Sequence, residues 1–356
     1  MSASSPRPDT IEAHSPSFPG LRKLLERLRD PVILMPYLGY GTPEKLKLCG
    51  RVLQDEGFRP AKDDERRWRN LVAFLKRMES DVIPGARVRA TYRDRSVETF
   101  SDSEGYFSVE FEAPGMAAGW HEIQLQLVGA EVAETGMVLV PSPDAEFGVI
   151  SDLDDTVIQS DVTRKFRMMV TLALSNAHTR KPFRGVAAFY RALHRGRNPF
   201  FYVSNSPRNL YAPLIEFLQH QQLPAGPLLL RDYGLRMNDD HKAMAIEDIL
   251  TTYPALRFIL IGDSGEQDPE MYTAVLSRYP ERVRVIYIRS VDRSPTRLQA
   301  IETLVEKVAS TRCQLVLAPD SEFAAAHAAA EGLIPAAELA QVRTDKTADL
   351  RAGPSR

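Results

Sequence analysis

The pattern of hydrophobic and polar positions changes once near the middle of the chain. Between residues 31 and 146, short apolar segments separated by turns predict β-strands. Apolar and polar residues alternate most clearly through Ile123, Leu125 and Leu127. After residue 147 the apolar runs are nearly continuous and alternate with helical segments. Such runs are typical of a parallel sheet that helices cover on both faces.

These patterns divide the chain into four parts. We expect a tail with a short amphipathic helix over residues 1–30 and a β-sandwich over 31–146, followed by an open α/β domain over 147–340 and a second tail over 341–356. In the sandwich, a helical insertion presents Trp68, Leu71, Val72, Leu75 and Met78 on one face. The hairpin "ETFSDSEGYFSVEF" resembles transthyretin-like and immunoglobulin-like modules, with Gly105 free to take a positive φ in its turn.

Composition and charge restrict the expected cellular location and the expected classes of binding partner. The chain has 356 residues, 44% of them hydrophobic and 26% charged, which is enough for two packed domains. A formal net charge of -2 gives no general reason to expect nucleic acid as a partner. Cys49 and Cys313 match no metal-binding spacing and suit a reducing compartment. With no signal peptide and no long apolar run in the sequence, we expect a cytoplasmic protein with at most peripheral membrane contact.

Polar side chains follow the apolar runs of the second region. In an open α/β sheet the ligand site lies at the carboxyl ends of the strands, so reactive residues are expected directly after these runs. "FGVI" is followed by "SDLDDT", "FFYV" by "SNS" and "FILI" by "GDSGEQD", and "HKAMAIEDIL" opens a helix between the last two runs. The candidate residues delivered to this edge are Asp152, Asp154, Thr156, Ser204, Asn205, Lys242, Asp263 and Asp268.

Two other chemistries that use similar residues do not fit the sequence. A calcium loop that starts at Asp152 needs glycine at its sixth position and glutamate at its twelfth, where this chain has Val157 and Thr163. "GDSG" also occurs at the nucleophile of chymotrypsin-like proteases, but Glu266 stands where the next glycine belongs. No histidine lies in a matching upstream signature.

The candidate residues suit phosphoryl transfer, in which catalysis is mainly positioning and charge neutralisation. An aspartate such as Asp152 can attack phosphorus and carry an aspartyl-phosphate. Asp154, two residues further on, is placed to act as general acid and then as base. Mg²⁺ prefers carboxylate oxygens together with water and phosphate oxygen, and Asp152 and Asp263 offer them. Ser204 and Lys242 would hold the other phosphate oxygens.

The order D-x-D-x-T, Ser, Lys and G-D followed by a further acid resembles the haloacid dehalogenase superfamily of phosphohydrolases. The strings "YVSNSP", "GPLLLRDYG", "HKAMAIEDILTTYP" and "FILIGDSGEQDPEMY" resemble more narrowly the actin-patch phosphatidate phosphatase family, over about residues 147–333. This resemblance implies a haloacid-dehalogenase-like domain, Mg²⁺ as cofactor, and phosphatidate, a phosphomonoester, as substrate.

Residue by residue, the resemblance implies Asp152 as nucleophile, Asp154 as acid, base and carbonyl ligand of the metal, and Asp263 as metal ligand. It places Ser204 and Lys242 at the phosphate, where we also expect Thr156 and Asn205, and it implies that Asp268 orients the hydrated metal. The chain departs from the family after "SNSP", where an aromatic Trp is usual and Arg208 stands. Arg208 is therefore a candidate substrate contact of a different kind.

The segment from Thr163 to Gly185 combines apolar residues with basic ones, including Arg164 and Arg167. It fits either a packed helix with a solvated charged face, which we prefer, or a surface that docks on anionic lipid and contacts the substrate. For the whole chain, a phosphatase of another bulky phosphomonoester, such as a phosphoprotein or a nucleic-acid end, and a non-catalytic adaptor are the remaining alternatives. The complete set of acids favours an enzyme.

Overall fold

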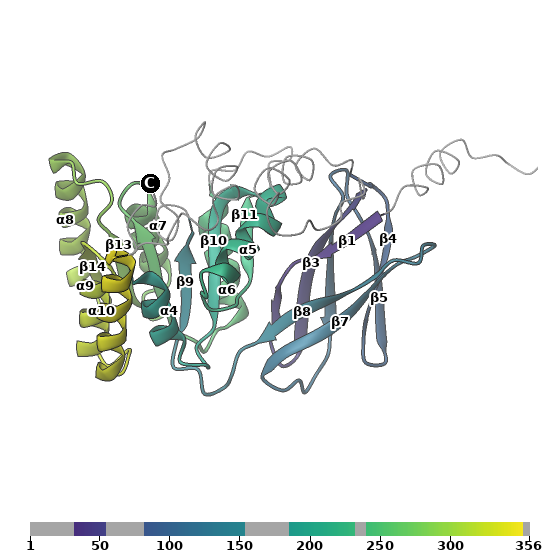
Figure 1. Cartoon of the computed structure of the whole chain (residues 1–356), viewed down its shortest axis with the longest axis horizontal. Coiled ribbons are helices and arrows are strands. Elements are labelled where there is room, and N and C mark those ends of the chain that lie inside the picture. Colours follow the sequence, from purple (N-terminus) through teal and green to yellow (C-terminus); the bar gives the residue numbers. More distant parts are fainter. Residues whose placement is uncertain (1–31, 55–81, 154–184, 232–239, 352–356) are drawn as a thin grey trace, which may run out of the picture.

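The computed structural model describes residues 32–54, 82–153, 185–231 and 240–351, which form two sheets joined between Val140 and Gly148 (Figure 1). The predicted helices near Leu24 and Trp68 lie outside these residues. In the described part of the chain, no helix is long and apolar enough to cross a membrane.

The first sheet joins eight strands of the described residues by hydrogen bonds, in the order β1-β3-β2-β8-β7-β4-β5, with β6 paired to β3. The strands are β1 (Val32–Pro36), β2 (Gly39–Gly41), β3 (Lys45–Gln54), β4 (Arg87–Tyr92), β5 (Arg95–Phe100), β6 (Tyr106–Glu112), β7 (Gly119–Leu127) and β8 (Ala133–Val140). Because they form one connected sheet, a sandwich of two separate sheets stays a prediction.

Alternation along these strands places one set of side chains in a shared core. Ile123, Leu125 and Leu127 are buried while their neighbours on β7 are exposed, as the sequence predicted. The turn before β6 also has the predicted form, because Gly105 has a φ of +78°. Asp102 fixes this turn by accepting hydrogen bonds from the backbone N–H groups of Glu104 and Tyr106.

The second sheet is parallel, and its strand order is β11-β10-β9-β12-β13-β14 among the described residues. Numbered along the domain this is 3-2-1-4-5-6, the order of doubly wound folds. The strands are β9 (Gly148–Asp152), β10 (Phe200–Pro207), β11 (Leu228–Arg231), β12 (Phe258–Asp263), β13 (Val283–Arg289) and β14 (Gln314–Ala318). The predicted α/β domain with a parallel sheet is therefore confirmed.

Helices cover both faces of this sheet (Figure 1). One face packs against α4 (Val186–His194), α5 (Tyr211–His220), α9 (Ser321–Ala330) and α10 (Ala336–Arg351). The other packs against α6 (His241–Thr252), α7 (Asp268–Arg278) and α8 (Pro295–Ala309). Val149 and Ile150 are both fully buried because successive residues of β9 enter opposite cores.

The predicted tail over residues 341–356 is wrong for its first part, because α10 continues to Arg351. Val342 is fully buried in the core that α10 shares with α4 and α9. Lys346 of α10 also forms ion pairs with Asp320, at 2.8 Å, and with Glu322, at 2.9 Å. These contacts fix a helix whose sequence is too polar to show a clear apolar face.

The first sheet contacts the α/β domain through β2 and β3, which lie against α6. Tyr40 of β2 donates a hydrogen bond to the Asp248 carboxylate on α6, and Lys47 forms an ion pair with the same group at 3.1 Å. The Tyr253 hydroxyl, just after α6, donates to the backbone carbonyl of Gly41 at 3.1 Å. The first sheet is therefore hydrogen-bonded to an element that also carries a candidate site residue, Lys242.

Candidate active site

The carboxyl ends of β9 and β12 meet at the middle of the parallel sheet. Asp152 is the last residue of β9 and Asp263 the last residue of β12, and these two strands are hydrogen-bonded neighbours. Strand order reverses between them, since β10 and β11 lie on one side and β13 and β14 on the other. In open α/β sheets this switch point is where ligands bind. Both aspartates are at most 1% exposed.

Lys242, in the first turn of α6, brings three carboxylates together. Its ammonium lies 2.8 Å from Oδ1 of Asp152, 2.7 Å from Oε2 of Glu266 and 3.0 Å from Oδ1 of Asp268. The lysine is only 4% exposed. Burial alone would lower the pKa of its ammonium, but attraction by the three carboxylates outweighs burial and raises that pKa well above its usual value. Lys242 is therefore held as a cation.

The loop between β12 and α7 is shaped by its own acids. Asp263 accepts hydrogen bonds on Oδ1 from the N–H groups of Gly265, at 2.6 Å, and Glu266, at 3.1 Å. Oδ2 of Asp268 accepts a hydrogen bond from the N–H of Asp263 at 3.3 Å. Gly262 makes room for this arrangement, because a Cβ there would lie 2.4 Å from the same Asp268 oxygen.

Residues outside the loop hold its backbone in place. Arg297 of α8 donates from Nε to the carbonyl of Ser264, at 2.7 Å, and from Nη2 to that of Glu266, at 2.6 Å. The Ser264 hydroxyl accepts the N–H groups of Val291 and Asp292, both at 2.9 Å, and donates to the carbonyl of Asp292. These hydrogen bonds of the Ser264 hydroxyl are all to backbone groups, so it has a structural role, which agrees with the exclusion of a protease nucleophile here.

The site carries an excess of carboxyl groups. Carboxylate oxygens of Asp152, Glu266 and Asp268 lie within 4.8 Å of one another, and Asp263, which is hydrogen-bonded to the loop of Glu266, is a fourth acid nearby. Burial raises the pKa of Asp263 from 3.8 to about 7, and repulsion from Asp268 adds to this shift. Burial likewise raises the pKa of Asp268, although Lys242 opposes the shift. Because Lys242 supplies one positive charge, the donor set fits a further cation bound by oxygen ligands.

The predicted metal ligands and the observed group of acids overlap only in part. Among the described residues, the group within 4.8 Å contains Asp152 but not Asp263. Asp154, the third predicted ligand, lies outside the described residues. Glu266 was not predicted as a site residue, although it stands inside the "GDSGEQD" motif. The signal that reveals Glu266 is its contact with Lys242.

Ser204 and Asn205 follow the core of β10. Ser204 is fully buried, and its hydroxyl accepts a hydrogen bond from the N–H of Ser206 at 2.9 Å. The Asn205 amide donates to Oε2 of Glu266 at 3.4 Å, which links this segment to the acids of the next strand. Arg208 begins the short helix η1 (Arg208–Leu210), and its guanidinium lies over the ring of Tyr106 on β6, 5.3 Å from the ring centre.

The remaining predicted residues are Thr156, Arg164 and Arg167, which lie outside the described residues together with the basic segment that contains the two arginines.

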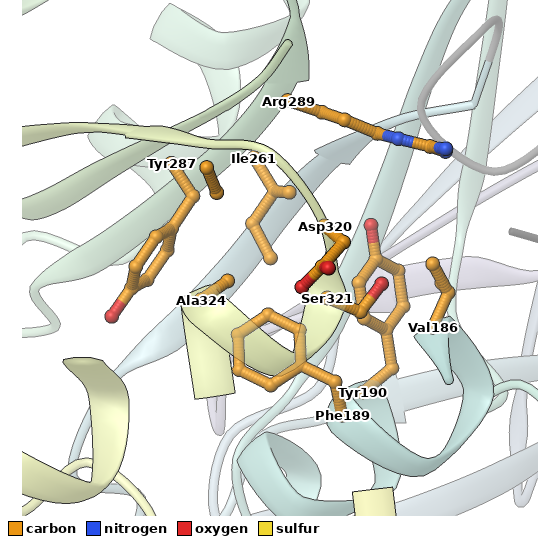
Figure 2. Close-up of a pocket in the computed structure, with 10 residues that line it drawn as sticks. Val186, Phe189, Tyr190, Ile261, Tyr287, Arg289, Asp320, Ser321 and Ala324 are labelled. Carbon is orange, nitrogen blue, oxygen red and sulfur yellow. The ribbon is translucent and has the colours of Figure 1, made fainter. Parts of the chain in front are cut away.

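A small cavity lies behind the site, between the sheet and the helices α4 and α9 (Figure 2). Its volume is about 30 Å³, which is room for a water molecule. Arg289 and Tyr190 lie on its wall (Figure 2). The Tyr190 hydroxyl is hydrogen-bonded at 2.7 Å to the hydroxyl of Ser151, which donates to the carbonyl of Asp152. This wall supports the end of β9.

Comparisons with known proteins agree with this site. Residues 147–290 match the family described as "Phosphatidate phosphatase APP1, catalytic domain". This part of the chain is therefore similar to the catalytic domain of the APP1 phosphatidate phosphatase family. The matched residues run from the residue before β9 to the residue after β13, so they include Asp152, Ser204, Lys242 and the acid loop. The resemblance found in the sequence is thereby confirmed.

Two curated relatives extend the comparison. Phosphatidate phosphatase APP1 of Saccharomyces cerevisiae is 34% identical over 155 residues, which cover 41% of this chain and 26% of the yeast protein. An uncharacterized protein of Schizosaccharomyces pombe is 28% identical over 243 residues, which cover 62% of this chain and 40% of the relative. The chain thus matches well under half the length of either relative.

Among solved structures, a haloacid dehalogenase family hydrolase from Deinococcus radiodurans R1, with bound phosphate and sodium, is 17% identical to this chain. The alignment covers 54% of this chain and 99% of that protein, with a TM-score of 0.34. A likeness at this level supports no conclusion about the site.

Proposed function

We propose that this protein is a Mg²⁺-dependent phosphomonoester hydrolase that converts phosphatidate to diacylglycerol through an aspartyl-phosphate. The observation that carries the proposal is the contact of Lys242 with the buried carboxylate of Asp152 at the switch point of the sheet. The match of the surrounding residues to the APP1 catalytic domain supports the choice of reaction and substrate.

In the proposed reaction, a carboxylate oxygen of Asp152 attacks phosphorus and the bond from phosphorus to the lipid oxygen breaks. Asp154 donates a proton to the departing oxygen, giving diacylglycerol. Asp154 then accepts a proton from a water molecule that attacks the aspartyl-phosphate, which releases inorganic phosphate and restores Asp152.

The positions of Lys242 and Ser204 support this scheme. The ammonium of Lys242 already lies 2.8 Å from the proposed nucleophile, so it would meet the negative oxygens of a phosphate bound there. Ser204, at the end of the neighbouring strand β10, offers a hydroxyl and adjacent backbone N–H groups. The hydrogen bond from Asn205 to Glu266 holds the end of β10 beside the loop that follows β12.

The excess of carboxyl groups is the reason to include a metal ion. We assign Asp152, Asp154 and Asp263 as its ligands, with Glu266 and Asp268 nearby to orient water around it. When bound, Mg²⁺ offsets the repulsion between the phosphate and the carboxylate that attacks it.

The proposal includes a cytoplasmic location and peripheral contact with the membrane that holds the substrate. The free thiols of Cys49 and Cys313 fit a reducing compartment. Another bulky phosphomonoester, such as a phosphoprotein or a 5'-phosphorylated nucleic acid, would suit the same catalytic residues, so the test must compare substrates.

The test is phosphate release from three substrates: phosphatidate in mixed micelles, a phosphopeptide and a 5'-phosphorylated oligonucleotide. We expect release from phosphatidate that requires Mg²⁺ and stops with EDTA. Release from either of the other two with none from the lipid would overturn the lipid assignment, and no release from any substrate would favour an adaptor. Asp144→Asn, which changes an exposed acid away from the site, is the control for loss of charge alone.

A further inference from the structure

The segment from Ser204 to Arg208 follows the part of β10 that is regularly paired. Pairing of β10 with β9 ends at Val203, opposite Asp152. On its other side, the register with β11 shifts between Ser204 and Pro207. The sheet therefore gives this segment less support than the core of the strand receives, although it contains a residue that is proposed to bind phosphate.

The first sheet supplies contacts to the end of this segment. The guanidinium of Arg208 lies 5.3 Å from the ring centre of Tyr106, on β6. The Tyr37 hydroxyl, between β1 and β2, points to the backbone carbonyl of Arg208 at 3.5 Å, a long hydrogen bond. Both tyrosines are only 8% exposed, so water competes little for these contacts.

A second pair of rings anchors the helix that continues from the segment. Tyr37 stacks on Tyr211, the first residue of α5, with ring centres 3.7 Å apart and planes 18° from parallel. The Tyr211 hydroxyl accepts the backbone N–H of Leu38 at 2.5 Å. Contacts from the first sheet thus reach both Arg208 and the start of α5, and hold the end of the segment between them.

We propose that Tyr37 and Tyr106 form an interdomain clamp on Arg208, and that this clamp positions the segment 204–208 for phosphate binding. The first sheet is then part of the catalytic unit rather than an independent binding module, and Arg208 is a positioning residue that does not touch the substrate. The expected effect on phosphate binding rests on the proposed function, whereas the contacts of Tyr37 and Tyr106 with Arg208 do not.

Arg208→Met tests the clamp, with Arg51→Met as the matched control. Arg51 also lies over the Tyr106 ring, 4.7 Å from its centre, and it donates to the carbonyl of Glu104. It belongs to the same sheet as Tyr106, so its loss removes a similar contact without releasing the segment. Arg208→Lys, which keeps a cation for the ring, is the conservative variant.

The first readout is hydrogen exchange of the peptide that covers residues 204–210, followed by mass spectrometry. We expect faster exchange in Arg208→Met, near-normal exchange in Arg208→Lys and no change in Arg51→Met. The second readout is inhibition of phosphate release by inorganic phosphate. Of these three variants, we expect only Arg208→Met to weaken inhibition, by about threefold to tenfold. This change in affinity corresponds to the free energy of one partly buried cation–π contact.

A double variant completes the test. Because Tyr106→Leu removes the same contact from the other side, adding it to Arg208→Met should weaken phosphate inhibition no further. Equal exchange in wild type and Arg208→Met, or equal effects of Arg208→Met and Arg51→Met on inhibition, would overturn the clamp. If wild type releases no phosphate from any substrate, the proposed function fails, and the exchange experiment still decides whether the clamp exists.

Discussion

Asp263→Asn should make the protein more stable at neutral pH, although the aspartate is assigned a role in catalysis. Burial raises the pKa of Asp263 from 3.8 to about 7. The folded protein therefore keeps a proton that the unfolded chain loses, and stability falls as the pH rises from about 4 to about 7. At about 1.4 kcal/mol for each pH unit, the penalty above pH 7 is about 4 kcal/mol without a bound cation.

Asparagine keeps the oxygen that accepts the N–H groups of Gly265 and Glu266 but carries no charge. We expect Asp263→Asn to exceed wild type by about 2 kcal/mol or more at pH 8 in EDTA, and to match it near pH 4. The assay is urea-induced unfolding followed by circular dichroism at both pH values. Mg²⁺ should stabilise wild type strongly, by about 2.7 kcal/mol at a hundred times its dissociation constant, and the variant much less.

Asp320→Asn is the control, because it should lower the stability at pH 8 that Asp263→Asn raises. Although partial burial opposes it, the ion pair with Lys346 and the N–H of Phe323 lower the pKa of Asp320, so its charge stabilises the folded protein at pH 8. Its loss should cost up to about 1 kcal/mol, as for other exposed pairs, with no effect on the response to Mg²⁺. Equal stability of wild type and Asp263→Asn at pH 8, with equal responses to Mg²⁺, would refute the electrostatic account of the site.

Three further substitutions probe the acid loop. Lys242→Met leaves buried carboxylates without their cation and should lower the free energy of unfolding by about 3–5 kcal/mol in urea titrations at pH 8; a loss below about 1 kcal/mol would contradict this. Arg297→Gln frees the carbonyls of Ser264 and Glu266 and should raise the Mg²⁺ concentration for half-maximal phosphate release at least about tenfold, whereas an unchanged value would show that the loop holds itself. Gly262→Ala forces a methyl group against Asp268 and should cost about 1–3 kcal/mol in thermal unfolding, and unchanged stability would mean that Asp268 moves aside freely.

The parallel sheet and its reactive edge were predictable because their signal is local. Continuous apolar runs mark buried strands, and the residues after each run must lie at the carboxyl ends. The contact of Lys242 with Asp152 follows from this topology, although the two residues are 90 positions apart in the sequence.

Other features depend on contacts that no local pattern encodes. Arg297 reaches the acid loop from α8, and nothing around it in the sequence distinguishes it from a surface arginine. The end of α10 is held by Val342 and by ion pairs of Lys346, so its polar sequence gave the impression of a tail. The place of Arg208 after "SNSP" made it a candidate substrate contact, which stays a prediction, but no local pattern indicated that its guanidinium lies over Tyr106 of the other sheet.

The central claim is that the carboxylate of Asp152 takes the phosphoryl group, and a rapid-quench experiment tests it most directly. The protein is mixed with Mg²⁺ and p-nitrophenyl phosphate, stopped in acid within milliseconds, and digested for peptide mass spectrometry. The account predicts a phosphoryl group on Asp152, and neither labelling nor phosphate release in Asp152→Asn. Phosphate release by Asp152→Asn at the wild-type rate would contradict it.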